Sequence, residues 1–243
     1  MNELSGKRAL VTGGARRVGA EIARALGAAG MDVAVHYHSS AADAEAVCGE
    51  IAERGGRGWP IRGDLSDRDQ ARDVVTGAIE QLGGLDLLVL CAANFDHVPF
   101  DRIQDSHWDR ALNVNLTAPF AMAHAARDAL RASRGAIVLI TCISRRAPYR
   151  DFLPYEVSKA GVHQLMRLLA LELAPEVRVN AVAPGTVLPP DGWDEARIAK
   201  LAERIPLGRA GSAGDVASAV LHLARHDFMT GEELVVDGGR SLR

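Results

Sequence analysis

Tyr155 and Lys159 are four residues apart in a stretch, 154–172, that has the apolar periodicity of a helix. On a helix, residues at i and i+4 lie side by side, so the phenol and the ammonium group become neighbours. A nearby cation favours the phenolate and predicts a lowered tyrosine pKa, bringing a group whose ordinary pKa is about 10 toward the range of a working acid or base. The same spacing occurs by chance on many exposed helices, so the rest of the chain must decide between the two interpretations.

A glycine-rich turn, residues 12–19, separates a short apolar segment, 8–11, from an alanine-rich helical segment that stops at Gly30. A second apolar segment, 32–37, follows, which gives the strand, turn, helix and strand of a dinucleotide-binding unit. Glycines let the backbone approach a pyrophosphate closely, and the helix start offers free amides and a positive dipole end. A plain tight turn is the alternative, but the flanking strand and helix favour nucleotide binding.

Strands and helices alternate along the whole chain. Further strands are predicted at 58–63, 85–90, 136–140, 178–183 and 233–237. The alternation predicts an α/β fold, a single-domain Rossmann-type doubly wound and mostly parallel sheet with helices on both faces. Pro60 predicts an edge position for its strand. We expect one domain over 1–243, with the irregular segment 186–207 as a substrate lid within it.

The composition indicates an ordinary globular protein: 243 residues, 48% hydrophobic and 24% charged, with a net charge of -3. Neither this balance nor the scattered arginines indicate a nucleic-acid or membrane partner. No apolar run approaches the ~20 residues that cross a bilayer, and the first residues lack the apolar core of a secretory signal. Cys48, Cys91 and Cys142 are far apart, so we expect no disulfide framework, no metal site and a cytoplasmic location.

Several motifs coincide in order and spacing, and through them the chain resembles the short-chain dehydrogenase/reductase family from end to end. The residues that carry the resemblance are the turn 12–19, Asp64, Asn115, Tyr155 with Lys159, Pro184-Gly185-Thr186, and the C-terminal segments 206–209, 215–217 and 236–239. Each motif is weak by itself, whereas the ordered set is specific. The resemblance implies an oxidoreductase that uses a nicotinamide cofactor and a small-molecule substrate.

The resemblance also implies the residues of the site. Tyr155 would donate or relay the proton, Lys159 would tune it and hold the nicotinamide ribose, and Asn115 would maintain a water-linked proton path. Cys142 takes the place of the family's catalytic serine. The implied cofactor-binding residues are Gly13, Arg16, Arg17, Val18, Gly19, His38, Ser39, Ser40, Asp64, Leu65, Ala92, Pro184, Gly185, Thr186 and Val187.

Departures from the usual family pattern indicate a branch. Arg17 stands where the turn usually has its middle glycine, which is similar to the pteridine reductase branch, as is the segment 36–40. Phe95 also resembles that branch, where an aromatic ring stacks a pterin against the nicotinamide. We therefore expect Phe95, Arg17 and Trp193 to contact the substrate. The alternative for Phe95 is simple packing at the sheet edge.

Two further departures weaken this substrate assignment. The segment 90–93 replaces the family's usual Asn-Asn-Ala-Gly, and the thiol of Cys142 is only a weak hydrogen-bond donor. Thr141 and Ser144 carry hydroxyls nearby, but their spacing to Tyr155 differs from the family's by one or two residues. A small buried apolar role is the alternative for Cys142.

Cofactor choice follows from charge. An acidic residue after the second strand would accept hydrogen bonds from a ribose 2′-hydroxyl and repel a 2′-phosphate, and none occurs in 33–42. Arg17, His38, Ser39 and Ser40 can donate hydrogen bonds to a phosphate instead. The sequence therefore predicts NADP(H).

The leading hypothesis is an NADPH-dependent reductase that transfers hydride to a pterin-like ring or a small carbonyl substrate. A reductase of 3-oxoacyl thioesters or other ketones is an alternative, since the shared motifs fit it equally well. An NADP-binding sensor or scaffold without catalysis is a third, motivated by Cys142. The family's members are often tetramers joined through helices corresponding to 101–131 and 155–173 and the C-terminal strand, so the resemblance implies a homotetramer.

Overall fold

The chain forms one seven-stranded sheet in the computed structural model, which describes residues 3–188 and 195–242. The strand order is β3-β2-β1-β4-β5-β6-β7, and every neighbouring pair is parallel. The strands are β1 (Arg8–Val11), β2 (Asp32–Tyr37), β3 (Arg57–Arg62), β4 (Leu87–Leu90), β5 (Ala136–Ile140), β6 (Arg178–Pro184) and β7 (Glu233–Val236). The expected single-domain Rossmann-type sheet is confirmed.

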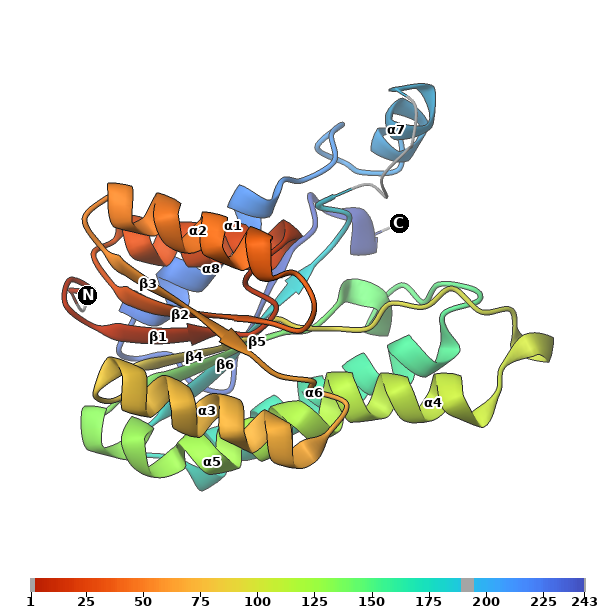
Figure 1. Cartoon of the computed structure of the whole chain (residues 1–243). Helices are drawn as coiled ribbons and strands as arrows, with labels where there is room; N and C mark the ends of the chain where they lie inside the picture. The colour runs from red at the N-terminus through yellow and green to blue at the C-terminus, as the bar shows by residue number, and fades with distance from the viewer. Residues whose placement is uncertain (1–2, 189–194, 243) are drawn as a thin grey trace.

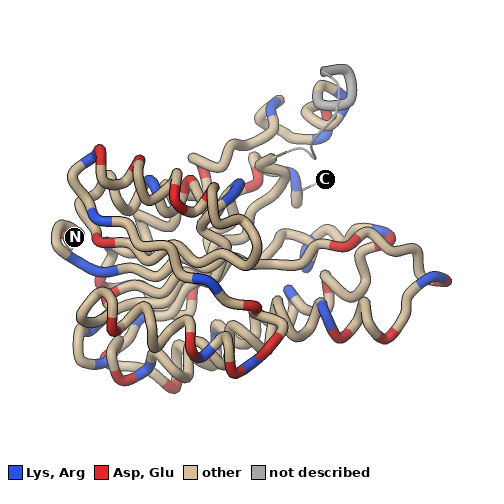
Figure 2. The backbone as a smooth tube through the Cα atoms, viewed as in Figure 1, with Lys and Arg blue, Asp and Glu red and all other residues tan. Residues whose placement is uncertain are grey.

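Helices cover both faces of this sheet (Figure 1). On one face lie α1 (Arg17–Ala28), α2 (Ala41–Glu53) and α8 (Ala213–Arg225), and on the other lie α3 (Arg68–Leu82), α4 (Asp105–Leu112), α5 (Ala118–Ser133) and α6 (Leu153–Glu172). Alternate residues of each strand point to opposite faces and fill two apolar cores, one around Val11 and Val89, the other around Leu10 and Leu88. Figure 2 shows the charged residues mostly on the surrounding helices and loops.

Burial explains the strand sequences. β4 and β5 are apolar at every position because both of their faces are covered. Among the strands of residues 3–188 and 195–242, only β3 has exposed positions. It lies at the sheet's edge, where Pro60 removes no central hydrogen bond. The edge position predicted from Pro60 is confirmed.

The chain reverses its direction across the sheet between β1 and β4, because β1 leads outward to β2 and β3 before β4 returns beside it. In such sheets, ligands bind outside the carboxyl ends of the strands at this switch point. The glycine-rich turn leaves β1 there, and the segment 91–94 leaves β4. The fold therefore brings two of the sequence motifs to one crevice.

A π-helical turn, Asn113–Thr117, joins α4 to α5. Pro119 lies in the first turn of α5, where its missing N–H is tolerated. The π turn before it is a rare element that is often found at functional sites. It carries Asn115 into the protein, where 1% of this residue's surface is exposed.

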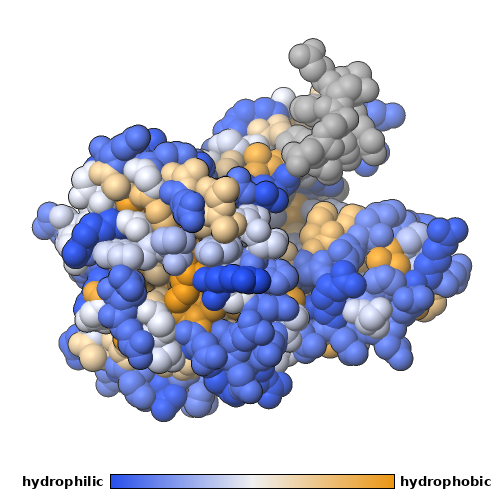
Figure 3. Space-filling model, viewed as in Figure 1, coloured by the Kyte–Doolittle hydropathy of each residue, from blue (hydrophilic) through white to orange (hydrophobic). Residues whose placement is uncertain are grey.

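The segment expected to form a lid leaves the sheet after β6 and includes α7 (Glu195–Ala202). In the space-filling view, a hollow separates the arm that carries α7 from the lobe that contains α4 (Figure 3). Trp193, expected to contact substrate, lies outside the described residues. Among the helices of 3–188 and 195–242, none has the length and apolarity needed to cross a membrane.

Candidate active site

The glycine-rich turn is packed too tightly for a Cβ at Gly13 or Gly19. A Cβ on Gly19 would lie 2.1 Å from the carbonyl oxygen of Gly13, and one on Gly13 would lie 3.0 Å from Ala92. Thr12 fixes the turn to the neighbouring strand, because its hydroxyl oxygen accepts hydrogen bonds from the amides of Cys91 (2.9 Å) and Ala92 (3.0 Å). The ends of β1 and β4 are therefore held together at the switch point.

Arg17 adopts the backbone conformation that explains the family's preference for glycine at this place. Its φ is +53°, in the left-handed region that L side chains rarely adopt. Its Nη2 donates a hydrogen bond to the carbonyl of Leu188 at 3.3 Å, which links the turn to the base of the expected lid. Arg16, the N-cap of α1, forms an ion pair of 2.5 Å with Asp43 of α2.

His36 supports the turn from β2. The Gly13 amide donates to its Nδ1 at 3.1 Å, so the ring proton lies on Nε2, which donates to the Gly63 carbonyl at 3.2 Å. Burial lowers the pKa of His36 to about 4. The neutral ring thus ties the glycine-rich turn to the end of β3.

The expected adenine side of the site is formed by the loops after β2 and β3. Asp64 accepts hydrogen bonds from the amide (2.9 Å) and hydroxyl (2.8 Å) of Ser66, which lower the pKa of its carboxyl. His38 lies 3.8 Å from this carboxylate, Leu65 is buried beside it, and Ser40 is the N-cap of α2 without a side-chain cap bond. Ser39 follows His38 on the exposed loop.

The expected nicotinamide side is formed by the turn after β6. Gly185 faces Asp237 so closely that a Cβ would lie 2.6 Å from the Asp237 Cβ. Thr186 accepts a backbone hydrogen bond from Gly211. A cavity of about 490 Å³ adjoins this turn and is lined by Thr186, Val187, Leu207 and Asp237, among others. The residues that line this cavity do not include Tyr155, Lys159, Asn115 or Cys142.

These features fit a dinucleotide. The turn leaves no room for a Cβ at Gly13 or Gly19, and α1 begins there without a side-chain cap or an acidic residue in its first turn. Free amides and a positive dipole end suit a pyrophosphate. The described residues 33–40 carry no carboxylate, as the NADP(H) hypothesis requires.

Tyr155 and Lys159 lie on one face of α6, as the spacing predicts, and both are buried. The Nζ of Lys159 lies 5.8 Å from the Tyr155 ring centre and donates to the Ile140 carbonyl at 2.7 Å. The expected lowering of the tyrosine pKa is wrong for the free protein. Burial raises the pKa of Tyr155 well above its ordinary value, and the Cys142 thiol raises it further. Burial also lowers the pKa of Lys159.

Asn115 forms a hydrogen-bond bridge to α6. Its Oδ1 accepts from the Asn94 amide (2.7 Å), and its Nδ2 donates to the Asn94 carbonyl and to Ser158 Oγ, both at 2.9 Å. Ser158 in turn donates to the Tyr155 carbonyl at 2.5 Å. The π turn, the loop after β4 and the first turn of α6 are therefore joined through one buried amide.

Cys142 begins the loop after β5, and its Sγ accepts a hydrogen bond from the Ser144 amide at 3.4 Å. The Thr141 hydroxyl cannot replace the missing serine hydroxyl, because its single proton is already shared by two acceptors, the Glu233 carboxylate (2.8 Å) and the Val182 carbonyl (3.1 Å). Ser144 is buried, with 3% of its surface exposed. At position 142 itself, the side chain offers a thiol in place of a hydroxyl.

Glu233 of β7 holds this loop in place through hydrogen bonds. Its carboxylate accepts hydrogen bonds from Thr141, from Arg145 and from His163 Nδ1 at 3.1 Å. Burial alone would raise the pKa of Glu233, but the hydrogen bonds, that from Arg145 first, hold it below the ordinary value. Since His163 lies one helical turn beyond Lys159, the carboxylate connects the loop of Cys142 to α6.

Aromatic rings line the site next to Tyr155. The Phe95 ring meets the Tyr155 ring edge-on at 4.6 Å between centroids and stacks on Phe152 at 4.4 Å. His97 meets Phe152 edge-on at 5.0 Å. Phe95 itself is 54% exposed, so about half of its surface remains accessible beside Tyr155.

Sequence reasoning missed several residues that hold the site together: Thr12, His36, Ser158 and Glu233. Thr12, His36 and Ser158 had a signal, because each lies inside a recognised motif or segment. Glu233 had none, since its partners come from a distant loop and helix.

The fold and this site together define an NAD(P)-dependent oxidoreductase of the Rossmann class, with a tyrosine and a lysine beside the crevice at the switch point. A family model described as "Enoyl-(Acyl carrier protein) reductase" matches residues 13–241. The chain belongs to the short-chain dehydrogenase/reductase family, which confirms the resemblance at that level and the expected enzyme class.

Relatives match nearly the whole chain. A 3beta-hydroxysteroid dehydrogenase 1 of Eggerthella lenta is 36% identical over 99% of this chain and 96% of its own length. A 3-oxoacyl-(acyl-carrier-protein) reductase of Staphylococcus aureus is 33% identical over 96% of this chain and 97% of its own. The crystal structure of a blue fluorescent protein from a metagenomic library in complex with NADPH is 34% identical, with a TM-score of 0.91 over 98% of this chain and 99% of that one.

Proposed function

We propose that this protein is an NADP(H)-dependent reductase that interconverts a carbonyl and an alcohol on a cyclic substrate. The observation that carries the proposal is the aromatic surface beside the proton donor: Phe95 lies edge-on to Tyr155 and stacks on Phe152. Flat or cyclic apolar groups pack well against such rings. A substrate lying there would have its carbonyl next to the Tyr155 hydroxyl.

The chain's residues would divide the work as follows. Bound NADPH supplies the hydride. Tyr155, which its raised pKa keeps protonated, donates its proton to the carbonyl oxygen. Lys159 and Asn115 hold the tyrosine's surroundings in place from α6 and the π turn. Arg17, at the turn, binds the cofactor phosphate and reaches toward the substrate side through Leu188.

Two observations favour NADP(H): the charge of the loop after β2, and the similarity to a solved structure that contains NADPH. The loop after β2 has no carboxylate to repel a 2′-phosphate, and His38, Ser39 and Ser40 can donate to one. The NADPH complex named above supports the same cofactor. Arg16 is the weaker candidate for phosphate binding, because Asp43 already pairs with it.

A pterin-like ring is the second candidate substrate, favoured by Arg17 in the turn and by the exposed ring of Phe95. Two observations weigh against it. Phe152 already covers one face of Phe95, and Cys142 provides no carboxylate where the pteridine reductase branch has an aspartate. A 3-oxoacyl thioester is a third candidate, supported by the Staphylococcus aureus relative.

The test is NADPH consumption by the purified protein with three substrate types: cyclic ketones of increasing ring number, dihydrobiopterin and an acetoacetyl thioester. We expect the highest kcat/KM with a cyclic ketone, at least tenfold more with NADPH than with NADH, and no turnover by Tyr155→Phe. A higher kcat/KM for either of the other substrates would contradict the cyclic carbonyl. Tight NADPH binding without any turnover would support the sensor or scaffold.

We also propose a homotetramer, as the family resemblance implies. Apolar side chains are exposed on the helices concerned, including Phe120 of α5 and Val157, Leu168 and Leu171 of α6. Clusters of this kind usually mark contact surfaces. Light scattering after gel filtration should give four times the 25.9 kDa chain mass, whereas a single-chain mass would contradict the proposal.

A further inference from the structure

Position 142 offers the proposed reaction site a thiol where the family has a serine hydroxyl, so a strong hydrogen-bond donor is missing there. A carbonyl that gains negative charge on its oxygen needs a second donor besides the proton-transferring tyrosine. The Cys142 thiol is a weak donor, and it already accepts from the Ser144 amide. The Thr141 hydroxyl is committed to Val182 and Glu233. Another group must provide the donor if the carbonyl is to be held firmly.

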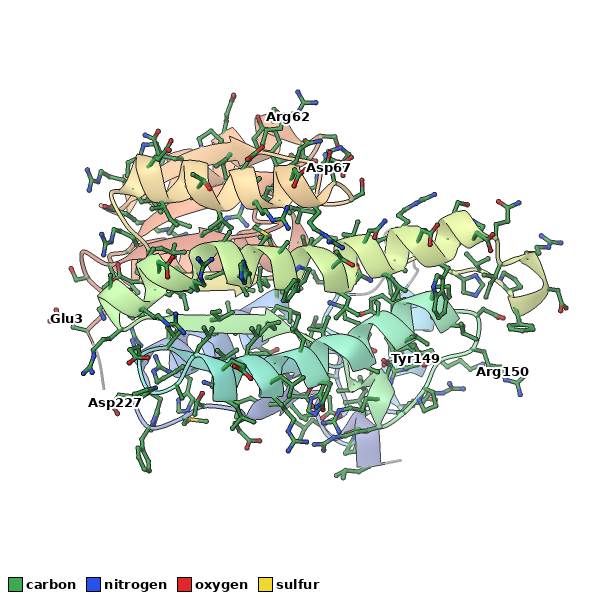
Figure 4. All side chains as sticks on the ribbon, turned by 90° about the horizontal axis from the view of Figure 1, so that it is seen from below. Glu3, Arg62, Asp67, Tyr149, Arg150 and Asp227 are labelled. Atoms are coloured by element: carbon green, nitrogen blue, oxygen red, sulfur yellow. The ribbon has the colours of Figure 1, made fainter. Side chains whose placement is uncertain are left out.

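Tyr149 lies on the same loop as Cys142 and is fixed from three sides. The edge of its ring meets Phe152 at 6.4 Å, and the Arg240 guanidinium lies 5.2 Å from its ring centre. Its backbone amide donates to the carboxylate of Glu156, the residue after Tyr155. In Figure 4 Tyr149 lies beside α6, while Arg150 lies at the outer edge of the molecule.

Ring contacts connect Tyr149 to Tyr155. The Tyr149 ring meets Phe152 at 6.4 Å, Phe152 stacks on Phe95 at 4.4 Å, and Phe95 meets the Tyr155 ring at 4.6 Å. Burial raises the pKa of Tyr149 to about 12, and the Cys142 thiol contributes to the increase. Tyr149 in turn contributes to the raised pKa of Tyr155, after burial and Cys142. A phenol with this pKa keeps its proton at every pH at which the enzyme would work, so it remains a donor.

We propose that the Tyr149 hydroxyl donates the second hydrogen bond to the substrate carbonyl, in place of the hydroxyl that position 142 lacks. Tyr149 keeps its own proton throughout, and Tyr155 transfers the proton that completes the alcohol. Arg240 and Phe152 act as positioning residues, since they hold the Tyr149 ring. This inference rests on the proposed carbonyl reduction.

The test removes one hydroxyl and then restores another. We expect Tyr149→Phe to lower kcat for the ketone roughly 10- to 100-fold with an unchanged Kd for NADPH, because the lost bond forms to the reacting oxygen. Adding Cys142→Ser to that variant should raise kcat for the ketone again by at least about tenfold. Thr76→Val, which removes an exposed hydroxyl on α3, is the matched control and should change nothing.

A second readout does not depend on turnover. A cyclic amide has a carbonyl that accepts hydrogen bonds but is not reduced, so its binding to the complex with NADP⁺ reports the donor alone. Tyr149→Phe should weaken this binding several-fold, and Cys142→Ser should restore it. The inference would be overturned if Tyr149→Phe bound the amide as tightly as the unmodified protein does. It would also be overturned if Cys142→Ser did not recover the kcat lost in Tyr149→Phe. Absence of ketone turnover in the unmodified protein, with amide binding still sensitive to Tyr149, would overturn only the proposed function.

Discussion

The ammonium nitrogen of Lys159 donates to the carbonyl of Ile140 and lies 5.8 Å from the centre of the Tyr155 ring. The lysine is thus fixed to the end of β5, and burial dominates the electrostatics of the tyrosine. In the free protein the phenol is held as a proton donor, the form that carbonyl reduction requires.

The first prediction concerns this proton. Because the pKa of Tyr155 is raised well above its ordinary value, the protonated form persists while an ordinary tyrosine ionises at about pH 10. Phenolate absorbance of the unmodified protein minus that of Tyr155→Phe should therefore show no ionisation up to that pH. The chain has only three tyrosines, so the difference is readily resolved. Ionisation of Tyr155 near pH 8 would show that Lys159, and not burial, dominates.

The second prediction concerns acid stability. The folded-state pKa of His36 is about 4, below the unfolded value of 6.5, so the unfolded state binds more protons between these values. Stability is then complete above pH 6.5 and falls as the pH decreases toward 4, by about 2 kcal/mol between pH 7 and pH 5 from this group. Urea unfolding at the two pH values measures the difference.

His36→Gln should remove most of that pH dependence, because glutamine does not titrate. His97→Gln is the control, since His97 lies on an exposed loop with 60% of its side chain accessible. If His36→Gln retains the full pH dependence, other groups are responsible for the acid sensitivity.

The third prediction uses the left-handed backbone of Arg17. Arg17→Gly should relieve strain of about 1 kcal/mol, whereas Arg17→Lys and Arg17→Ala should not. NADPH affinity should rank the three variants differently, because it depends on the positive charge. Arg17→Gly and Arg17→Ala should weaken NADPH binding roughly tenfold, whereas Arg17→Lys should preserve most of it. Thermal unfolding and NADPH titration of the three variants separate backbone from charge. Identical ranking in both measurements would contradict this division.

The fourth prediction concerns the close approach of Gly19 and Gly13. A Cβ at position 19 would lie 2.1 Å from a backbone oxygen, so Gly19→Ala must displace the turn and should cost at least about 2 kcal/mol along with most NADPH affinity. Gly49→Ala is the matched control on α2, where a Cβ meets nothing within 4 Å. That control should stabilise the protein by about 0.5–1 kcal/mol, as measured by urea unfolding. Normal NADPH affinity in Gly19→Ala would argue against the turn as the phosphate site.

The sequence determined the fold and the order of the motifs, because strand burial and helical periodicity are local properties of the chain. Pro60 gave the edge strand, and the spacing of Tyr155 and Lys159 correctly placed them on one helical face. The spacing could not give their electrostatics, because burial and the Cys142 thiol come from the folded surroundings and outweigh the nearby lysine.

Only the tertiary structure decided which side chains share the site. Glu233 reaches the loop of Cys142 from β7, and Phe152 brings Phe95 and Tyr149 into one aromatic cluster. No periodicity connects these positions, because contacts between distant segments depend on how strands pair and how loops close over the sheet's carboxyl edge. The physical reason is range: propensity and spacing act over a few residues, whereas burial, charge and donor geometry at a reaction site depend on the packing of the whole domain.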